Sequence, residues 1–150
     1  MIVDSTSGKK VATTEKPFIL ALKMGEDLFA GILRCAEEAD LKSASISGLG
    51  ALDDVTVAYY NLNTKSYQTK LFAGMYELIS LHGNITKLDG KHFIHIHAAL
   101  GTEEYNVVGG HIMSATVGPS AEITVVPLSN TINRAYDEQT GLKLMCPLMA

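Results

Sequence analysis

The sequence predicts an α+β domain in which a mainly antiparallel β-sheet is combined with one principal helix. Only one segment, near residues 27–39, repeats its apolar side chains at helical spacing. The other apolar segments are short, and most turns between them are too short for the crossovers of parallel strands, which gives about eight strands. With 150 residues, of which 47% are hydrophobic and 19% charged, the chain is long enough to bury the core of one such domain.

The first third of the chain is expected to hold a lead-in, a strand and the helix. Residues 1–16 are rich in Ser, Thr, Lys and Gly without periodicity, so we predict a loose lead-in, which could include a short strand, to a single domain over residues 17–150. The apolar run Phe18–Leu22 predicts a buried strand. The helix is predicted from about Asp27 to Ala39, with acidic residues at its start, where the helix dipole favours them. Its predicted apolar face consists of Leu28, Ile32, Cys35, Ala36 and Ala39.

The rest of the chain is predicted to be strands separated by turns. The Asp89-Gly90 pair indicates a tight hairpin, and Gly74 and Gly118-Pro119 are expected to separate strands. The apolar tail 142–150 is expected to pack on the domain or on a neighbouring subunit, because free tails are rarely so apolar. The predicted strands are 43–48, 55–60, 66–72, 75–85, 92–100, 106–117 and 121–128.

Charge and cysteine content narrow the class of protein. The formal net charge of −4 lowers the expectation that the chain binds nucleic acid through its phosphates. Cys35 and Cys146 form no CxxC pair, so both are expected to be reduced and packed in a cytoplasmic protein. No apolar run predicts a transmembrane helix, and Asp4 stands where a signal peptide would need basic residues, so no membrane association is expected.

Three of the five histidines are predicted to converge on one face of two neighbouring strands. His95 and His97 are two residues apart, so in a strand they point to the same side of the sheet. A hairpin centred on Glu104 would place His111 opposite His97, with Cβ atoms about 4.5–5.5 Å apart. Three imidazoles suit a divalent transition metal and leave a position for water or substrate. The alternative is that these histidines are packed or surface residues, and His92 is expected to face solvent.

The preceding hairpin adds two residues to this face. A two-residue Asp89-Gly90 turn would pair His82 with His97 and Asn84 with His95. His82 could then be a fourth ligand, a proton-transfer group or a residue that supports a ligand. A turn one residue longer would move His82 out of register.

Gly109 and Gly110, directly before His111, have two interpretations. Glycines permit a bulge or a tight twist of the strand. Bare backbone beside His111 would also leave room for a ligand at the metal. The two interpretations are compatible.

The order and spacing of five segments carry a resemblance to a known family. These segments are Gly25–Leu28, Ser47–Leu52, Tyr76–Asn84, Phe93–His97 and Val107–His111. They resemble those of the PPC ("plants and prokaryotes conserved") domain in its stand-alone prokaryotic form, over about residues 18–130. The resemblance implies a compact α+β fold, a homotrimer and a histidine site near the subunit boundaries that holds a metal in some prokaryotic members. The family's HxH and GGH histidines carry over to His95, His97 and His111, whereas His82 stands where a small residue such as Ser is expected.

The favoured hypothesis is a metal-containing homotrimer that binds or transforms a small molecule. Zinc is the expected metal, with iron or nickel as alternatives, because imidazole ligands alone do not select among these metals. Whether the protein is an enzyme stays open, since no carboxylate falls on the predicted histidine face to act as a general base.

Two other functions compete with this hypothesis. Plant members of the family carry AT-hooks beside the domain, which suggests a DNA-associated or transcription-linked protein. This chain lacks the Arg-Gly-Arg-Pro core of an AT-hook, so direct DNA binding is not expected. The third possibility is an assembly module that depends on the trimer and the apolar tail.

Overall fold

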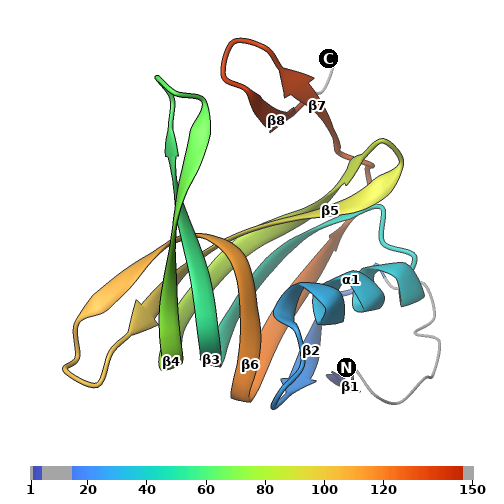
Figure 1. Ribbon diagram of the computed structural model, residues 1–150. Helices are drawn as coiled ribbons and strands as arrows, with labels where there is room; N and C mark the ends of the chain where they lie inside the picture. The colour runs from blue at the N-terminus through green and yellow to red at the C-terminus, as the bar shows by residue number, and fades with distance from the viewer. Residues whose placement is uncertain (1, 5–14, 147–150) are drawn as a thin grey trace.

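One helix and eight strands occur in the computed structural model, which describes residues 2–4 and 15–146 (Figure 1). The α+β class with a mainly antiparallel sheet and one principal helix is confirmed. A strand lies in the segment expected to be a loose lead-in, and residues 5–14 and 147–150 lie outside the described residues. The elements are β1 (Ile2–Asp4), β2 (Phe18–Lys23), α1 (Leu28–Glu38), β3 (Ser43–Asn61), β4 (Ser66–Leu88), β5 (Lys91–Gly101), β6 (Val107–Leu128), β7 (Asn133–Asp137) and β8 (Leu142–Met145).

The sheet has the order β1-β2-β6-β3-β4-β7-β8, and β5 pairs with both β4 and β6. Strands β3, β4, β5 and β6 therefore each pair with two others of this set, and their pairing closes on itself. The β1–β2 and β4–β7 pairs are parallel and the other pairs are antiparallel. The β7–β8 hairpin stands above the rest of the sheet, across from the tip of the β3–β4 hairpin (Figure 1).

The predicted breaks at Gly74 and Gly118-Pro119 are wrong, because both lie inside long strands. Each coincides with a register shift, so the extra residues form bulges that bend the strand without ending it. At the first bulge, the backbone N–H of Gly74 donates to Oδ1 of Asp54, 2.9 Å away. A proline is tolerated at the second because a bulge residue need not donate to the ladder. Strands β3, β4 and β6 each join two of the strands that the sequence suggested.

Helix α1 covers one face of the sheet (Figure 1) and begins one residue later than predicted. Asp27 is its N-cap, and Oδ1 of Asp27 accepts from the backbone N–H of Ala30 at 2.7 Å. The buried face packs on β2, β5 and β6, and burial of a Leu or Ile side chain contributes about 1.5–3 kcal/mol. A Cβ at Gly31 would lie 2.6 Å from Cδ2 of Leu22, so the Leu22 side chain would have to shift to accept one.

Two further expectations can be compared with the described chain. Cys35 is buried in the core and free, as expected, but Cys146 is free and exposed, so its predicted packing is wrong. Among the described residues, no helix has the length and apolar character needed to cross a bilayer.

Candidate metal centre

Strand register brings the predicted histidines together. The Asp89-Gly90 turn has two residues, so Leu88 pairs with Lys91, Asn84 with His95 and His82 with His97. On the other side of β5, His97 pairs with His111 of β6. Each of these pairings was predicted from the turns, and the register predictions are confirmed.

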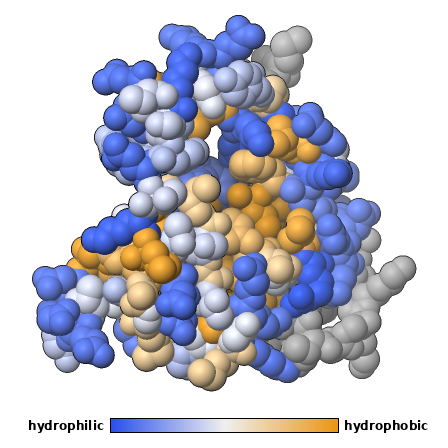
Figure 2. All heavy atoms as spheres, in the orientation of Figure 1, coloured by the Kyte–Doolittle hydropathy of each residue, from blue (hydrophilic) through white to orange (hydrophobic). Residues whose placement is uncertain are grey.

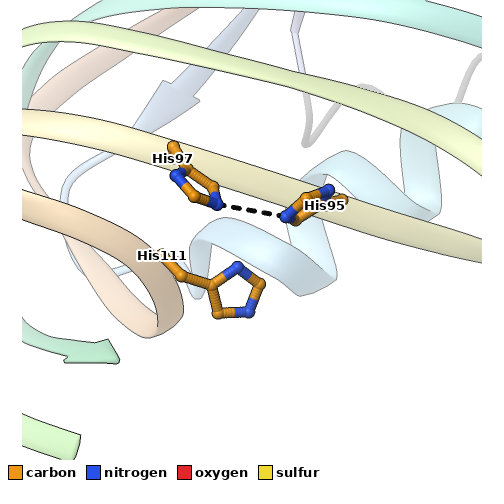
Figure 3. Close-up of side chains that lie close together, drawn as sticks. All are labelled: His95, His97 and His111. Atoms are coloured by element: carbon orange, nitrogen blue, oxygen red, sulfur yellow. Dashed lines mark hydrogen bonds between the residues drawn. The ribbon is translucent and has the colours of Figure 1, made fainter. Parts of the chain in front are cut away.

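The rings of His95, His97 and His111 face one another from two adjacent strands (Figure 3). Their centroids are 5.0 Å apart for His95–His97, 5.0 Å for His95–His111 and 5.3 Å for His97–His111. One ring nitrogen from each residue belongs to a set whose members all lie within 4.8 Å of one another. The arrangement is that of a possible three-imidazole metal site.

The nitrogen spacing fits a metal ion. Two nitrogens bound to one tetrahedral zinc at about 2.0–2.1 Å lie about 3.3–3.4 Å apart. Nε2 of His95 and Nε2 of His97 are already 3.2 Å apart, as a hydrogen bond in which one nitrogen donates and the other accepts. A metal between them would replace that shared proton. His111 would need to move closer to complete the set, since the full set spans up to 4.8 Å.

The surroundings of the rings favour neutral imidazole. The pKa of His95 is lowered to about 4, first by burial and then by repulsion from His111, His97 and Arg134, in this order. Burial, followed by repulsion from His97, also lowers the pKa of His111. Only the neutral ring has a free lone pair for a metal, so these two ligands need not release a proton to bind one at neutral pH.

Close approach of the strands explains the two glycines before His111. A Cβ on Gly109 would lie 2.0 Å from the carbonyl oxygen of Ala98 on β5, so only glycine lets the two strands meet here. Gly110 has a φ of +151°, which favours glycine, and it lines the hollow beside the histidines. The steric interpretation is therefore confirmed at Gly109. Room for a ligand beside His111 stays a prediction.

Two other histidines lie outside the cluster. His82 is exposed and pairs with His97 across the strands, yet it contributes no nitrogen to the three-histidine set and lines a separate hollow with Ser47 and Glu122. His92 was expected to face solvent, but it is half-buried and its Nε2 lies 2.7 Å from the carbonyl oxygen of Leu41.

A hollow of about 600 Å³ opens beside the three rings, and sequence reasoning missed several of its residues. Figure 2 shows the gap above it, between the β3–β4 and β7–β8 hairpins, with apolar residues beneath. Tyr67 stacks on the His111 ring at 5.3 Å between centroids. The turn over 61–66 pairs Tyr60 with Tyr67, and the register of this turn is the sequence signal that could have indicated Tyr67. Arg134 lies on the short strand β7, which was not predicted, and no sequence signal marks this residue.

Comparisons with known proteins show similarity to one domain family and to several solved structures. The profile of the Plants and Prokaryotes Conserved (PCC) domain matches residues 9–129. A metal-containing protein from Archaeoglobus fulgidus is 41% identical, with a TM-score of 0.83 over 88% of this chain and 94% of its own. A plant- and prokaryote-conserved (PPC) protein from Pyrococcus horikoshii is 32% identical, with a TM-score of 0.83 over 90% and 94%. A protein from Bacteroides thetaiotaomicron, described as a candidate DNA-binding protein, is 28% identical, with a TM-score of 0.83 over 92% and 94%. No curated protein matches the chain.

Proposed function

This chain belongs to the Plants and Prokaryotes Conserved domain family, and from that premise we propose that His95, His97 and His111 bind a divalent transition metal. The observation that carries the proposal is the convergence of three imidazoles with one nitrogen pair at 3.2 Å. The similar protein from Archaeoglobus fulgidus, which is described as metal-containing, supports it. The lowered pKa values of His95 and His111 also support it, because they leave lone pairs free.

Zinc is the metal that we propose, with iron or nickel as alternatives. Imidazole nitrogens bind all three metals, and three ligands leave an open coordination position. A metal in this place would supply Lewis acidity toward an oxygen of a bound molecule. The hollow beside the rings has room for a small molecule, which it would bind or transform.

Elemental analysis of protein purified without chelator tests the proposal. We expect close to one metal ion per chain for the native protein and a large loss of metal for His97→Ala. The matched control is His82→Ala. His82 lies on β4, directly opposite His97, and contributes no nitrogen to the cluster. A native protein without stoichiometric metal, or an equal loss in both variants, would contradict the site.

We also propose that the protein is a cytoplasmic homotrimer, as the family resemblance implies. Large apolar side chains that remain exposed support subunit contacts, among them Leu49, Met75 and Ile79 at 56%, 60% and 54% exposure. Light scattering should give three times the 16.1 kDa of one chain. A monomer mass at micromolar concentration would contradict the trimer.

DNA association is the second candidate function, because the similar protein from Bacteroides thetaiotaomicron is described in those terms. The net charge of −4 and the lack of an AT-hook core weigh against direct binding by this chain. A gel-shift titration over a range of salt concentrations decides between the two functions. Binding that weakens steeply with salt would favour the DNA function, and no binding would remove it.

A further inference from the structure

The hollow beside the three histidines has an unusual charge distribution. Among the described residues that line it, none is acidic, and the charged ones are Arg134 and Lys143. Three tyrosines and several apolar side chains form most of the remaining wall, including Phe93, Leu142 and Leu144. The hollow therefore has a positive potential even before any metal is considered.

Of the two charged residues that line the hollow, Arg134 is the buried one. Its exposure is only 9%, and it reaches into the hollow from β7. Within the described part of the chain, no carboxylate lies within 4.0 Å of its guanidinium. Burying a cation without a counter-charge is costly, and neutral hydrogen-bond acceptors compensate for only part of that cost.

The guanidinium is held rigidly by neutral acceptors. Nε donates to Oγ1 of Thr86 at 2.9 Å, and Nη1 donates to the carbonyl oxygen of Lys143 at 2.8 Å. Nη2 donates to Oδ1 of Asn84 at 2.9 Å and lies 3.5 Å from Nδ1 of His95. Of the five guanidinium N–H groups, one on Nη1 has no partner in these contacts. Arg134 is thus fixed beside the histidine cluster with one donor to spare.

From this geometry we propose that the hollow binds a small organic carboxylate whose negative charge lies beside Arg134 and the three histidines. The inference rests on the proposed metal site, because a metal on the histidines would add a second positive charge beside the same hollow. A single remaining N–H suits one carboxylate oxygen better than a phosphate, which usually takes several donors. The apolar wall, with Phe93 and Leu144, suits the hydrocarbon part of such a ligand.

The competing explanation is that Arg134 only anchors the β7–β8 hairpin. Its bonds to Thr86 and Asn84 on β4 and to Lys143 on β8 do tie these strands together. An anchoring role would make the stability of the protein depend on Arg134, but it would not make ligand binding depend on ligand charge. The test must therefore change the charge of the hollow while the hydrogen bonds stay in place.

Asn84→Asp makes that change. The new carboxylate keeps an oxygen acceptor 2.9 Å from Nη2 and gives Arg134 the counter-charge that it lacks. Calorimetric titrations of the wild type and of this variant would use benzoate and benzamide, which share a ring and differ in charge. The content of zinc, iron and nickel would be measured on the same samples, and each titration would be repeated on metal-free protein.

We expect the wild type to bind benzoate at least about tenfold more tightly than benzamide. The Asn84→Asp variant should bind benzoate about tenfold more weakly than the wild type does, with benzamide binding unchanged. Arg134→Gln should abolish the preference if it folds, which circular dichroism would show. Equal affinity of the wild type for the two ligands, or an unchanged preference in Asn84→Asp, would overturn the inference. Lack of any stoichiometric transition metal would overturn the proposed metal site instead, and the charge preference of the metal-free protein would still decide the role of Arg134.

Discussion

Replacing Gly109 by alanine would disturb the metal centre without touching any of its ligands. Gly109 lies on β6, two residues before His111, and pairs with Ala99 of β5. The added methyl group would point at the backbone of β5, with the carbonyl oxygen of Ala98 at 2.0 Å and Cα of Ala99 at 3.2 Å. Backbone atoms of a paired strand cannot rotate away, so the two strands must separate.

The required movement can be estimated from these distances. Real Cβ atoms essentially never approach heavy atoms closer than 3.0 Å, so β6 must shift by about 1 Å relative to β5. Metal–ligand distances tolerate only about 0.2 Å, and His97 and His111 are held by the two strands that separate. We expect metal affinity to fall by about 10–100-fold, comparable to the loss of a partner that orients a ligand. Overpacking should cost about 1–3 kcal/mol, a decrease in Tm of about 2–12 °C.

Metal titration and thermal unfolding of the same samples would measure both effects. The matched control is Gly101→Ala in the same hairpin, where a Cβ would meet only side-chain atoms of Ile79 and Glu77 at 3.2–3.4 Å. Ile79 is 54% exposed and can move, so this variant should keep nearly full metal affinity. Wild-type metal affinity and Tm in Gly109→Ala would refute the argument that strand contact positions His111.

Three other outcomes are expected. Burial and the neighbouring His111, His97 and Arg134 lower the pKa of His95 to about 4, below its usual value of about 6.5, so the unfolded chain takes up this proton first as the pH falls. The Tm of chelator-treated protein should therefore decrease between pH 6.5 and 4, and a His95→Gln variant with the same slope would contradict this cause. Burial raises the pKa of the Cys35 thiol to about 11. A thiol reagent at pH 8 should therefore modify exposed Cys146 first and Cys35 only after unfolding, and equal modification rates of the two cysteines would be contrary evidence. Tyr60→Phe removes a hydroxyl that donates to the carbonyl oxygen of Thr140 at 2.6 Å, so amide exchange in the β7–β8 turn should accelerate, and an unchanged rate would count against this tether.

The part of the site that local turn chemistry determines was predictable from the sequence. Asp89 and Gly90 both have positive φ, at 51° and 78°, as a tight two-residue hairpin requires. Such a turn sets the register of the strands beside it, and the hairpin around Glu104 does the same for β5 and β6. Because side chains alternate along strands, register alone then places His95, His97 and His111 on one face. The metal itself stays a prediction.

Features that depend on contacts distant in sequence were not predictable in this way. Arg134 reaches His95 because β7 pairs in parallel with β4, and no local signal in 129–137 encodes that pairing. Gly74 and Pro119 were expected to end strands because they disfavour regular pairing. They occupy bulges instead, since the neighbouring strands continue to bury apolar residues on both sides of the bend. Tertiary burial thus outweighed the local preference of these residues.

The histidine side and the Arg134 side of the hollow are held by different numbers of strand pairings. The histidines lie on β5 and β6, inside the closed pairing of four strands, so their positions are tied to the register of the whole sheet. Arg134 lies on β7, which pairs with β4 through only two residue pairs, Lys87↔Asn133 and Leu88↔Arg134. A change in the β7–β8 hairpin can therefore alter the charge and the wall of the hollow while the register of β5 and β6 is kept, whereas a change between β5 and β6 alters the positions of the imidazoles directly. On this arrangement, substitutions in the hairpin should shift which anion is bound, and substitutions at the β5–β6 contact should shift whether a metal is bound at all.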